Sequence, residues 1–580
     1  MTHRRAAMAL LAFLAVPGAA PAQDLASTAG PGRRGGRLVV AQRAEPKTLN
    51  PVTAVDSASR EVIHRMTGDL VHIHRASHAT GPALAREWNV SQDGRRFTLR
   101  LRQGVRFSDG RPFTADDVLF TFEVYLDARL RSPQRDLLVV GGKPLSVRKQ
   151  DDRTVVFETA APYAPAERLF DSIAMLPRHL LEKPYREGRL AQAWGLNTPP
   201  AEMAGLGPFR LKEYVAGQRI VLERNPYYWK VDRAGARLPY LDELVFLMAP
   251  GEDAQVIRFQ AGETDVIGRV GARNFAVLER DQKTRGYTMR DLGPSLEYNF
   301  LFFNLNDLAG RNLPRVEARQ AWFREEKFRQ AVSAAIDREA IVRLVYGGRG
   351  APLWGHVTPG NRNWVNRALP QPPRSLERAR ALLAGAGFRH GADGALLDRA
   401  GAKVEFTIAV PASNAERGQM AAIVQEDLRQ AGMAVRVAPL EFRAMLDRVF
   451  QSRDYDAGVL GLGGGDADPA PEMGVWLSSG GTHLWDLGRT RPATPWEAEI
   501  DVLIERQLIT MRYPERKRLY DRVQELVAAH LPVVALGSPN VLVGAKDGLR
   551  NFRPALLDHH VLWNRSEEHT SELQSLSHLV

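Results

Sequence analysis

The sequence predicts an α/β protein that folds around more than one hydrophobic core. A chain of 580 residues with 44% hydrophobic residues is larger than the roughly 250 to 300 residues that a single core serves. Between residues 375 and 437 helical patterns alternate with short apolar runs, as in an α/β lobe with a mixed sheet. The 49 Gly and 36 Pro residues follow no fixed period, which excludes a collagen-like chain.

Over residues 38–107 the sequence predicts strands with one helix between them. Residues 38–41 form a short apolar strand that ends at AEPKTLNP, because Pro46 and Pro51 prevent a regular continuation. A helix is expected over residues 58–71. In RRFTLRLRQGVRF, residues 95–107, apolar and polar residues alternate, which predicts a hairpin of half-buried strands.

Capping residues mark the starts of several helices. Thr114, followed by Asp116 and Asp117, supplies an N-cap hydroxyl and carboxylates in the first turn. Two consecutive helices are expected between Phe328 and Gly347, the second capped by Asp337. The α/β lobe then continues with these elements: a helix opened by Ser375 and Glu377, a strand over 404–410, a helix over 419–431 and a strand over 434–437.

Both ends of the chain are expected to lie outside the fold. Arg4 and Arg5 precede an apolar run of 11 residues and the small residues Ala20-Pro21-Ala22, the pattern of a signal peptide over residues 1–22 that is cleaved after Ala22. The run is too short for the roughly 20 residues of a membrane anchor. Residues 565–580, RSEEHTSELQSLSHLV, differ in composition from the body, and we expect them to be a non-native tail. The predicted location is the periplasm.

Composition excludes several classes of function. The chain has no cysteine, which removes disulfides, thiol nucleophiles, zinc ribbons and iron–sulfur ligation. The formal net charge of +11 comes from 67 Arg and 11 Lys that are scattered along the chain. This pattern fits an Arg-rich coding bias better than a phosphate-binding stripe, so we expect no nucleic-acid partner.

Motifs for catalysis are missing. The sequence contains no GxSxG elbow, no P-loop and no HExxH, and its two glycine runs, at 347–350 and 461–465, lack the GxGxxG spacing. We expect no enzyme and no cofactor, although a pair of catalytic carboxylates would leave no local signature.

Two clusters of polar residues were considered as metal sites. His72, His74 and His78 are predicted to be solvated on an exposed strand and loop, since no carboxylate or Cys lies beside them in sequence. The carboxylates of GGGDADPAPE do not fit a calcium loop because of its two prolines. The sequence therefore predicts no metal site.

Several segments resemble the family-5 extracellular solute-binding proteins, the oligopeptide- and dipeptide-binding components of ABC importers. The resemblance covers nearly the whole predicted mature chain in family order. Its segments are LAREWNVSQDGRRFTLRLRQGVRFSDGRPFTADDVLFTFE (84–123), GLGPFRLKEYVAGQRIVLERNPYYW (205–229), YLDELVF (240–246), QAGETDV (260–266), FRQAVSAAIDREAIV (328–342), ARALLAGAGF (379–388) and YDAGVLGLGGGDADP (455–469).

The resemblance implies a two-lobed periplasmic-binding-protein fold with a hinge and closure of the lobes on a ligand. It implies a discontinuous first lobe of residues 36–73, 205–286 and 515–564. An extra subdomain, residues 74–204, would be inserted in the first lobe. Residues 287–514 would form the second lobe.

The resemblance also implies a ligand-binding site. Asp466 occupies the position at which peptide-binding relatives pair a second-lobe Asp with the peptide α-ammonium, a charge-assisted contact. Larger residues common before that Asp are replaced here by glycines, including Gly463 and Gly464, which open the pocket or bring backbone amides to the ligand. Glu45 and Thr48 lie in the segment that resembles the first-lobe ligand strand. The other cleft candidates are Asn304, Trp354 and Trp476.

The sequence therefore predicts a monomeric receptor that captures a peptide or peptide-like solute, with an amine as its expected anchor, and delivers it to an inner-membrane ABC permease. Opines, nickel chelates and oligosaccharides remain possible solutes within the family. Two other functions stay open at this point: an exported hydrolase acting on peptide or cell-wall material, and a protein of the same fold that presents its ligand to a sensor or acts as a chaperone.

Overall fold

The fold is taken from a computed structural model, which describes residues 32–463, 467–557, 560–562 and 569–570. The predicted signal peptide, residues 1–22, lies outside the described residues, as does the predicted tail except for His569–Thr570. Those two residues form strand β24, which pairs with β23 (Leu549–Arg550). Within the described part of the chain, no helix is both long and apolar enough to cross a bilayer.

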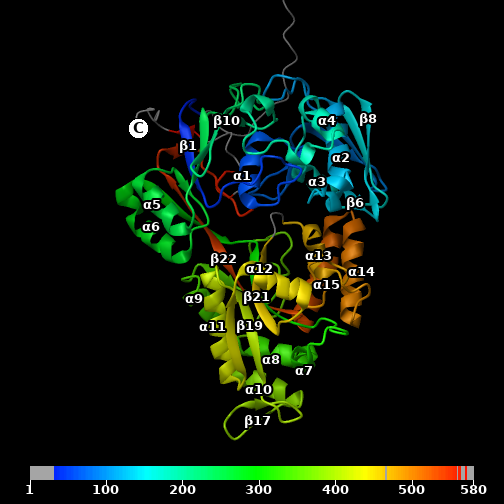
Figure 1. Cartoon of the computed structure of the whole chain (residues 1–580), viewed down its shortest axis with the longest axis vertical. Helices are drawn as coiled ribbons and strands as arrows, with labels where there is room; N and C mark the ends of the chain where they lie inside the picture. The colour runs from blue at the N-terminus through cyan, green and yellow to red at the C-terminus, as the bar shows by residue number, and fades with distance from the viewer. Residues whose placement is uncertain (1–31, 464–466, 558–559, 563–568, 571–580) are drawn as a thin grey trace, which may run out of the picture.

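The chain forms two lobes that share one twelve-stranded sheet, with the first lobe at the top of Figure 1. The sheet is mixed, because β1 pairs with β12 in parallel while β11 pairs with β12 in antiparallel. The α/β class and the mixed sheet predicted from the sequence are confirmed.

The first-lobe part of the sheet is covered by three helices, α1 (Ser57–Met66), α5 (Glu252–Ala261) and α6 (Ala272–Arg285). Apolar side chains of α5 and α6 pack with those of the neighbouring strands in a small core of their own. The strands of this part are β10 (Phe209–Val215), β11 (Arg219–Arg224), β12 (Glu243–Met248), β1 (Arg37–Gln42), β13 (Val266–Ile267) and β14 (Tyr287–Pro294).

The second-lobe part of the sheet carries a separate core on each face. Its strands are β15 (Glu297–Phe303), β21 (Ala457–Gly463), β19 (Glu405–Pro411), β20 (Ala434–Leu440) and β16 (Gly350–Pro352). Its helices are α7 (Pro314–Arg324), α8 (Glu326–Ala335), α9 (Arg338–Leu344), α10 (Leu376–Gly385), α11 (Ala415–Gln430), α12 (Phe442–Asp447), α13 (Met473–Trp476), α14 (Pro495–Ile509) and α15 (Tyr513–His530).

One long strand, β22 (Val533–Lys546), belongs to both lobes and runs between them in Figure 1. Its first half pairs with β15, and its second half pairs with β14 and β13. The chain also crosses between the lobes where β14 leads into β15. The lobe boundaries remain a prediction. Residues 287–294 hydrogen-bond in the first-lobe sheet, and α15 packs in the second-lobe core, although the sequence assigned most of that helix to the first lobe.

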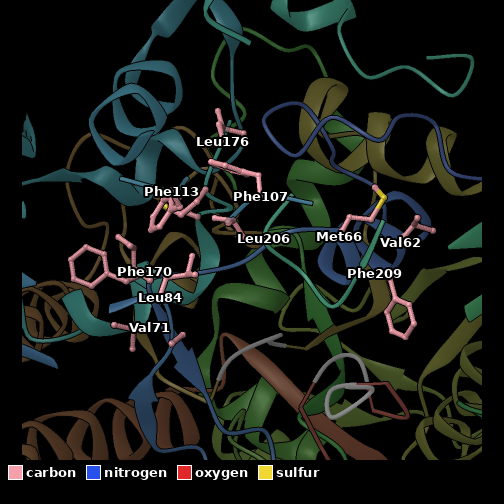
Figure 2. Close-up of a cluster of buried hydrophobic side chains, with 14 of the residues drawn as sticks. Val62, Met66, Val71, Leu84, Phe107, Phe113, Phe170, Leu176, Leu206 and Phe209 are labelled. Atoms are coloured by element: carbon pink, nitrogen blue, oxygen red, sulfur yellow. The ribbon is translucent and has the colours of Figure 1, made fainter. Parts of the chain in front are cut away.

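The predicted inserted segment, residues 74–204, contains a four-stranded sheet with helices α2 (Ala115–Leu126), α3 (Ala166–Ser172) and α4 (Arg178–Arg186). Its core is continuous with that of the first lobe. In Figure 2, Phe107, Phe113 and Phe170 of the segment lie in one cluster with Met66 of α1 and Phe209 of β10. The strands of its sheet are β4 (Ala85–Val90), β5 (Arg96–Leu101), β9 (Thr154–Glu158) and β8 (Ser146–Asp151).

Local capping signals predicted helix starts correctly. Thr114 and Asp117 form a capping box at the start of α2, and Asp337 accepts a hydrogen bond from the Ala340 N–H at the start of α9. The helix expected over 58–71 ends earlier, at Met66. Thr67 is extended and β2 (Val71–Ile73) follows, so that part of the prediction was wrong.

The two lobes touch each other. Ile73 and Leu557, from the first-lobe side, form a buried cluster with Leu296 and Ala467 of the second. The inserted segment also reaches the second lobe, since the Ala164 N–H donates to the Leu508 carbonyl at 2.7 Å. The two lobes are therefore in direct contact.

Candidate ligand cleft

The candidate site lies where parallel strands of the two lobes end. Strands β1, β12 and β13 run parallel in the first lobe, and β19, β20 and β21 run parallel in the second. Ligands of open α/β sheets bind beyond the carboxyl ends of such strands, because the loops that follow carry the polar groups. The residues just after these strands are therefore the first to consider.

On the first lobe, Arg43 follows β1 and donates through Nη2 to the Arg269 carbonyl at 2.9 Å. Its Nη2 also lies 4.0 Å from Glu252 Oε2, at the start of α5. A pocket with about 1020 Å³ of empty space, counting the open solvent at its mouth, lies beside these residues. It is lined by Val40, Ala41, Gln42, Arg43, Ala44, Ser57, Ala58, Arg60, Glu61, Phe246, Gln255, Gly268, Arg269, His560 and Val561.

On the second lobe, Arg417 in the first turn of α11 is held in a fixed position. Its Nε donates to Asn299 Oδ1 at 2.9 Å, and its Nη2 donates to Glu297 Oε1 at 2.9 Å. Gly461 of β21 makes room for this arrangement. A methyl group on Gly461 would collide with the Arg417 guanidinium and lie 2.6 Å from Asn299 Oδ1.

The two charged faces act on each other. Burial raises the pKa of Glu416, the neighbour of Arg417, and the carboxylates of Glu297 and of Glu252 on the opposite lobe raise it further. Arg417 and Arg43 lower it. The cleft therefore holds both carboxylates and guanidinium groups, contributed by both lobes.

The glycine run after β21 is described only at its start. Gly463 ends β21 opposite Glu297, and a Cβ there would lie 2.8 Å from the Glu297 Cα, so the close approach of β15 requires glycine. Gly464 and Asp466 lie outside the described residues, so the amine contact of Asp466 stays a prediction.

Glu45 and Thr48 stabilise the segment in which they lie. Glu45 Oε1 accepts hydrogen bonds from Tyr214 Oη at 2.6 Å and from the Gly217 N–H at 2.7 Å, and these bonds lower its pKa. Thr48 Oγ1 accepts from the Asn50 N–H at 3.0 Å. Both side chains thus have partners within the first lobe, and a ligand contact for either stays a prediction.

Asn304 lies far from the ends of β15 and β21 that face the cleft. It is fully buried, and its Nδ2 donates to the Arg453 and Tyr455 carbonyls, each at 2.8 Å. Its Oδ1 accepts from Gln320 Nε2 at 3.1 Å. Seven residues at about 3.4 Å each put it roughly 24 Å along the strand direction from Glu297. We therefore leave Asn304 out of the proposed site.

The two tryptophans have different surroundings. Trp354 is half-buried, its Nε1 donates to the Pro372 carbonyl at 3.1 Å, and the Arg338 guanidinium lies 5.7 Å from its ring centroid. Trp476 is 2% exposed and packs against His356 with ring centroids 4.0 Å apart. Only Trp476 is next to a polar cavity of the second lobe.

Sequence reasoning missed Arg417, Glu416 and Glu297. The signal that points to the first two is positional: they follow Asn414, the N-cap of α11, at the carboxyl end of a predicted buried strand. Charged residues at that place face the cleft in an α/β lobe. Nothing local marks Glu297, whose role depends on the pairing of β15 with β21.

The histidine prediction was wrong for His72 and His78. His72 Nδ1 lies 3.4 Å from Asp171 Oδ1, and His78 is buried. Asp69, His72 and Asp171 are close enough together to hold a metal ion. However, Arg75 Nη2 pairs with Asp171 Oδ2 at 2.9 Å and supplies positive charge there, so we propose no metal site.

Asp468, in the calcium candidate GGGDADPAPE, is bound in an ion pair. Its two oxygens each accept a hydrogen bond from the Arg516 guanidinium at 2.8 Å, and both side chains are buried. Its carboxylate is therefore committed to Arg516.

Two α/β lobes whose charged residues act on each other define a ligand-binding protein of the periplasmic-binding class. The sequence model of the family described as "Bacterial extracellular solute-binding proteins, family 5 Middle" matches residues 79–483. The chain belongs to this family, which is non-enzymatic. The hypothesis of an exported hydrolase is therefore wrong.

Known proteins resemble the chain over most of its length. A Deinococcus radiodurans protein described as a probable ABC transporter-binding protein is 28% identical over 91% of each chain. The oligopeptide-binding protein AppA of Bacillus subtilis is 26% identical over 91% of this chain and 90% of its own. The structure of AppA with a nonapeptide matches at a TM-score of 0.70 and 24% identity, covering 93% of this chain and all of AppA. The structure of Campylobacter jejuni NikZ with Ni(L-His) matches at a TM-score of 0.72 and 21% identity, covering 92% of this chain and 99% of the NikZ chain. The two-lobed fold is thereby confirmed.

Proposed function

We propose that this ABC transporter solute-binding protein captures a peptide or peptide-like, amine-bearing solute in its cleft and delivers it, in the periplasm, to an inner-membrane permease. The single observation that carries the proposal is the pairing of opposite charges in the cleft. Arg417 and Arg43 match a carboxylate, and Glu416 and Glu297 match an ammonium group. A zwitterion such as a short peptide has both.

The relatives support a peptide but include other solutes. AppA is named as an oligopeptide-binding protein and was solved with a nonapeptide. NikZ was solved with Ni(L-His). In a metal–amino acid complex the amine and carboxylate bind the metal, so a peptide and a metal complex present different groups and the solute has to be identified directly. Asp466 remains the proposed partner of the peptide α-ammonium. We also expect the receptor to act as a monomer.

Native mass spectrometry of the chain, purified without refolding from the periplasm, tests this proposal. A solute trapped between closed lobes survives purification, so we expect a co-purified series of masses that fit short peptides. Calorimetry with Ala-Ala-Ala, before and after removal of the trapped solute, then gives the affinity. Saturable binding without cleavage of the peptide is the expected result.

Other outcomes would redirect the proposal. A single mass that fits a nickel–amino acid complex or an oligosaccharide would refute the peptide assignment and leave the solute-binding fold in place. Recovery of the chain in the cytoplasmic fraction with its first 22 residues intact would refute the proposed location. Peptide binding together with an intact transporter that imports no peptide would favour presentation to a sensor.

A further inference from the structure

A small polar cavity lies inside the second lobe, next to the cleft. It has about 330 Å³ of empty space, counting the solvent at its opening. The cavity lies between the start of β15, residues 356–361, residues 467–472 and α15. Its polar lining includes His356, Asn361, Glu472 and Tyr520.

The cavity lies next to the contact between the lobes. Leu296 and Ala467 line the cavity, and both also pack against Ile73 and Leu557 of the first-lobe side. The cavity therefore borders the region where the two lobes meet.

Two buried polar atoms of the cavity lining have no protein partner among the described residues. They are His356 Nδ1 and Asn361 Oδ1, and His356 is 2% exposed. His356 Nε2 is paired with Tyr520 Oη at 3.0 Å, and Asn361 Nδ2 donates to the Ala467 carbonyl at 2.8 Å, so each of these side chains is held in place. A buried polar group without a partner costs free energy, which indicates an occupant.

Two acidic side chains line the cavity, and among the described residues Asp468 pairs with Arg516 while Glu472 is in no ion pair. Burial raises the pKa of Glu472 to about 7, and the nearby Trp476 indole lowers it. No described Lys or Arg contributes to that shift. Arg516, the cation nearby in the same lobe, is committed to Asp468. Burial lowers the pKa of His356 to about 3, so this imidazole is neutral at physiological pH.

We propose that the cavity is a subsite for a primary ammonium group of the solute, with Glu472 as its counter-charge and Asn361 Oδ1 and His356 Nδ1 as further acceptors. A water molecule would satisfy the acceptors but leave the carboxylate without a cation, and an anion would be repelled by it. An ammonium group has three donors and the size of a water molecule, whereas a guanidinium is planar and larger. The subsite rests on the proposed function, because it needs a solute in the cleft.

The ammonium has two possible sources in a peptide, an α-amine or a lysine side chain, and peptide probes distinguish them. Calorimetry would compare Ala-Lys-Ala, Ala-norleucine-Ala and N-acetyl-Ala-Lys-Ala on the wild type, on Glu472→Gln and on Glu499→Gln. Glu499 is an exposed residue of α14 that pairs with Arg522, so its variant is the matched control.

If the lysine amine occupies the subsite, norleucine weakens binding about tenfold or more in the wild type and by less than about twofold in Glu472→Gln. If the α-amine occupies the subsite, acetylation has this Glu472-dependent effect instead, and Glu472 would replace Asp466 as the proposed partner of the α-ammonium. Equal affinities of all three probes for the wild type and Glu472→Gln would overturn the subsite and indicate a bound water only. Failure of every peptide to bind would instead overturn the proposed function, and with it the subsite.

The pH dependence of binding gives a second measurement that needs no variant. The groups facing Glu472 are the phenols of Tyr298 and Tyr520, the neutral His356 and the Asp468–Arg516 pair. A lysine amine stays protonated between pH 8 and 6 and needs the ionised carboxylate, so affinity through that amine should fall as the pH drops from 8 to 6, below the pKa of about 7. A flat profile over this range would contradict the role of Glu472.

Discussion

The two faces of the cleft hold their charges in different ways. On the first lobe, the Arg43 side chain is 50% exposed and its guanidinium lies 4.0 Å from Glu252. On the second lobe, the Arg417 side chain is 15% exposed and makes two hydrogen bonds of 2.9 Å to Asn299 and Glu297. The difference indicates that the second lobe is preorganised for the solute, while the first lobe adapts to it on closure.

The largest expected effect is on the buried ion pair behind the second-lobe face. Asp468→Asn leaves the buried Arg516 guanidinium without its counter-charge, so the free energy of unfolding should fall by about 3 kcal/mol or more. Arg43→Gln, on the exposed first-lobe face, should change it by less than about 0.5 kcal/mol. Urea unfolding followed by circular dichroism measures both. Equal losses in the free energy of unfolding for the two variants would contradict the difference between the two lobes.

A smaller effect is expected from filling the space beside Arg417. Gly461→Ala puts a methyl group against the guanidinium and Asn299, which should destabilise the protein by about 1 to 2 kcal/mol and weaken solute binding. Gly481→Ala is the matched control in the same lobe, because its Cβ would have no heavy atom within 4 Å. Thermal unfolding and calorimetry of the two variants provide the test. A wild-type unfolding temperature for Gly461→Ala would show that Arg417 is not held rigidly.

The smallest effect is expected on binding affinity, when one arginine of each lobe, Arg417 or Arg43, is replaced. This prediction rests on the proposed function. Arg417→Gln should weaken binding of Ala-Ala-Ala about tenfold, and Arg43→Gln only about twofold, because the more exposed cation is screened by water. With the C-terminal amide of the same peptide, the Arg417 variant should bind like the wild type. A larger loss for Arg43→Gln would reverse the assignment of the preorganised face.

Local features of the fold could be predicted from the sequence, while most of the site could not. The caps at Thr114 and Asp337 act within one helical turn, so a short window of sequence contains all the partners. The helix end at Met66 was missed because the following residues join β2, whose partner strand β3 (Thr80–Pro82) lies further along the chain.

Site residues depend on contacts that are distant in sequence. Asn304 was proposed for the cleft, yet its partners come from Gln320, Arg453 and Tyr455, which fix it inside the lobe. Glu472 became notable only when folding surrounded it with Tyr298, His356 and Tyr520. Charge and burial at one point in space are not encoded by neighbours in the chain.

Strand β22 has a consequence for the biogenesis of the protein. Because residues 533–546 pair with β15 in one lobe and with β13 and β14 in the other, neither half of the sheet is complete until these residues have been synthesised. Every other strand of the twelve-stranded sheet precedes β22 in the chain. One late strand therefore completes the sheet in both lobes during synthesis.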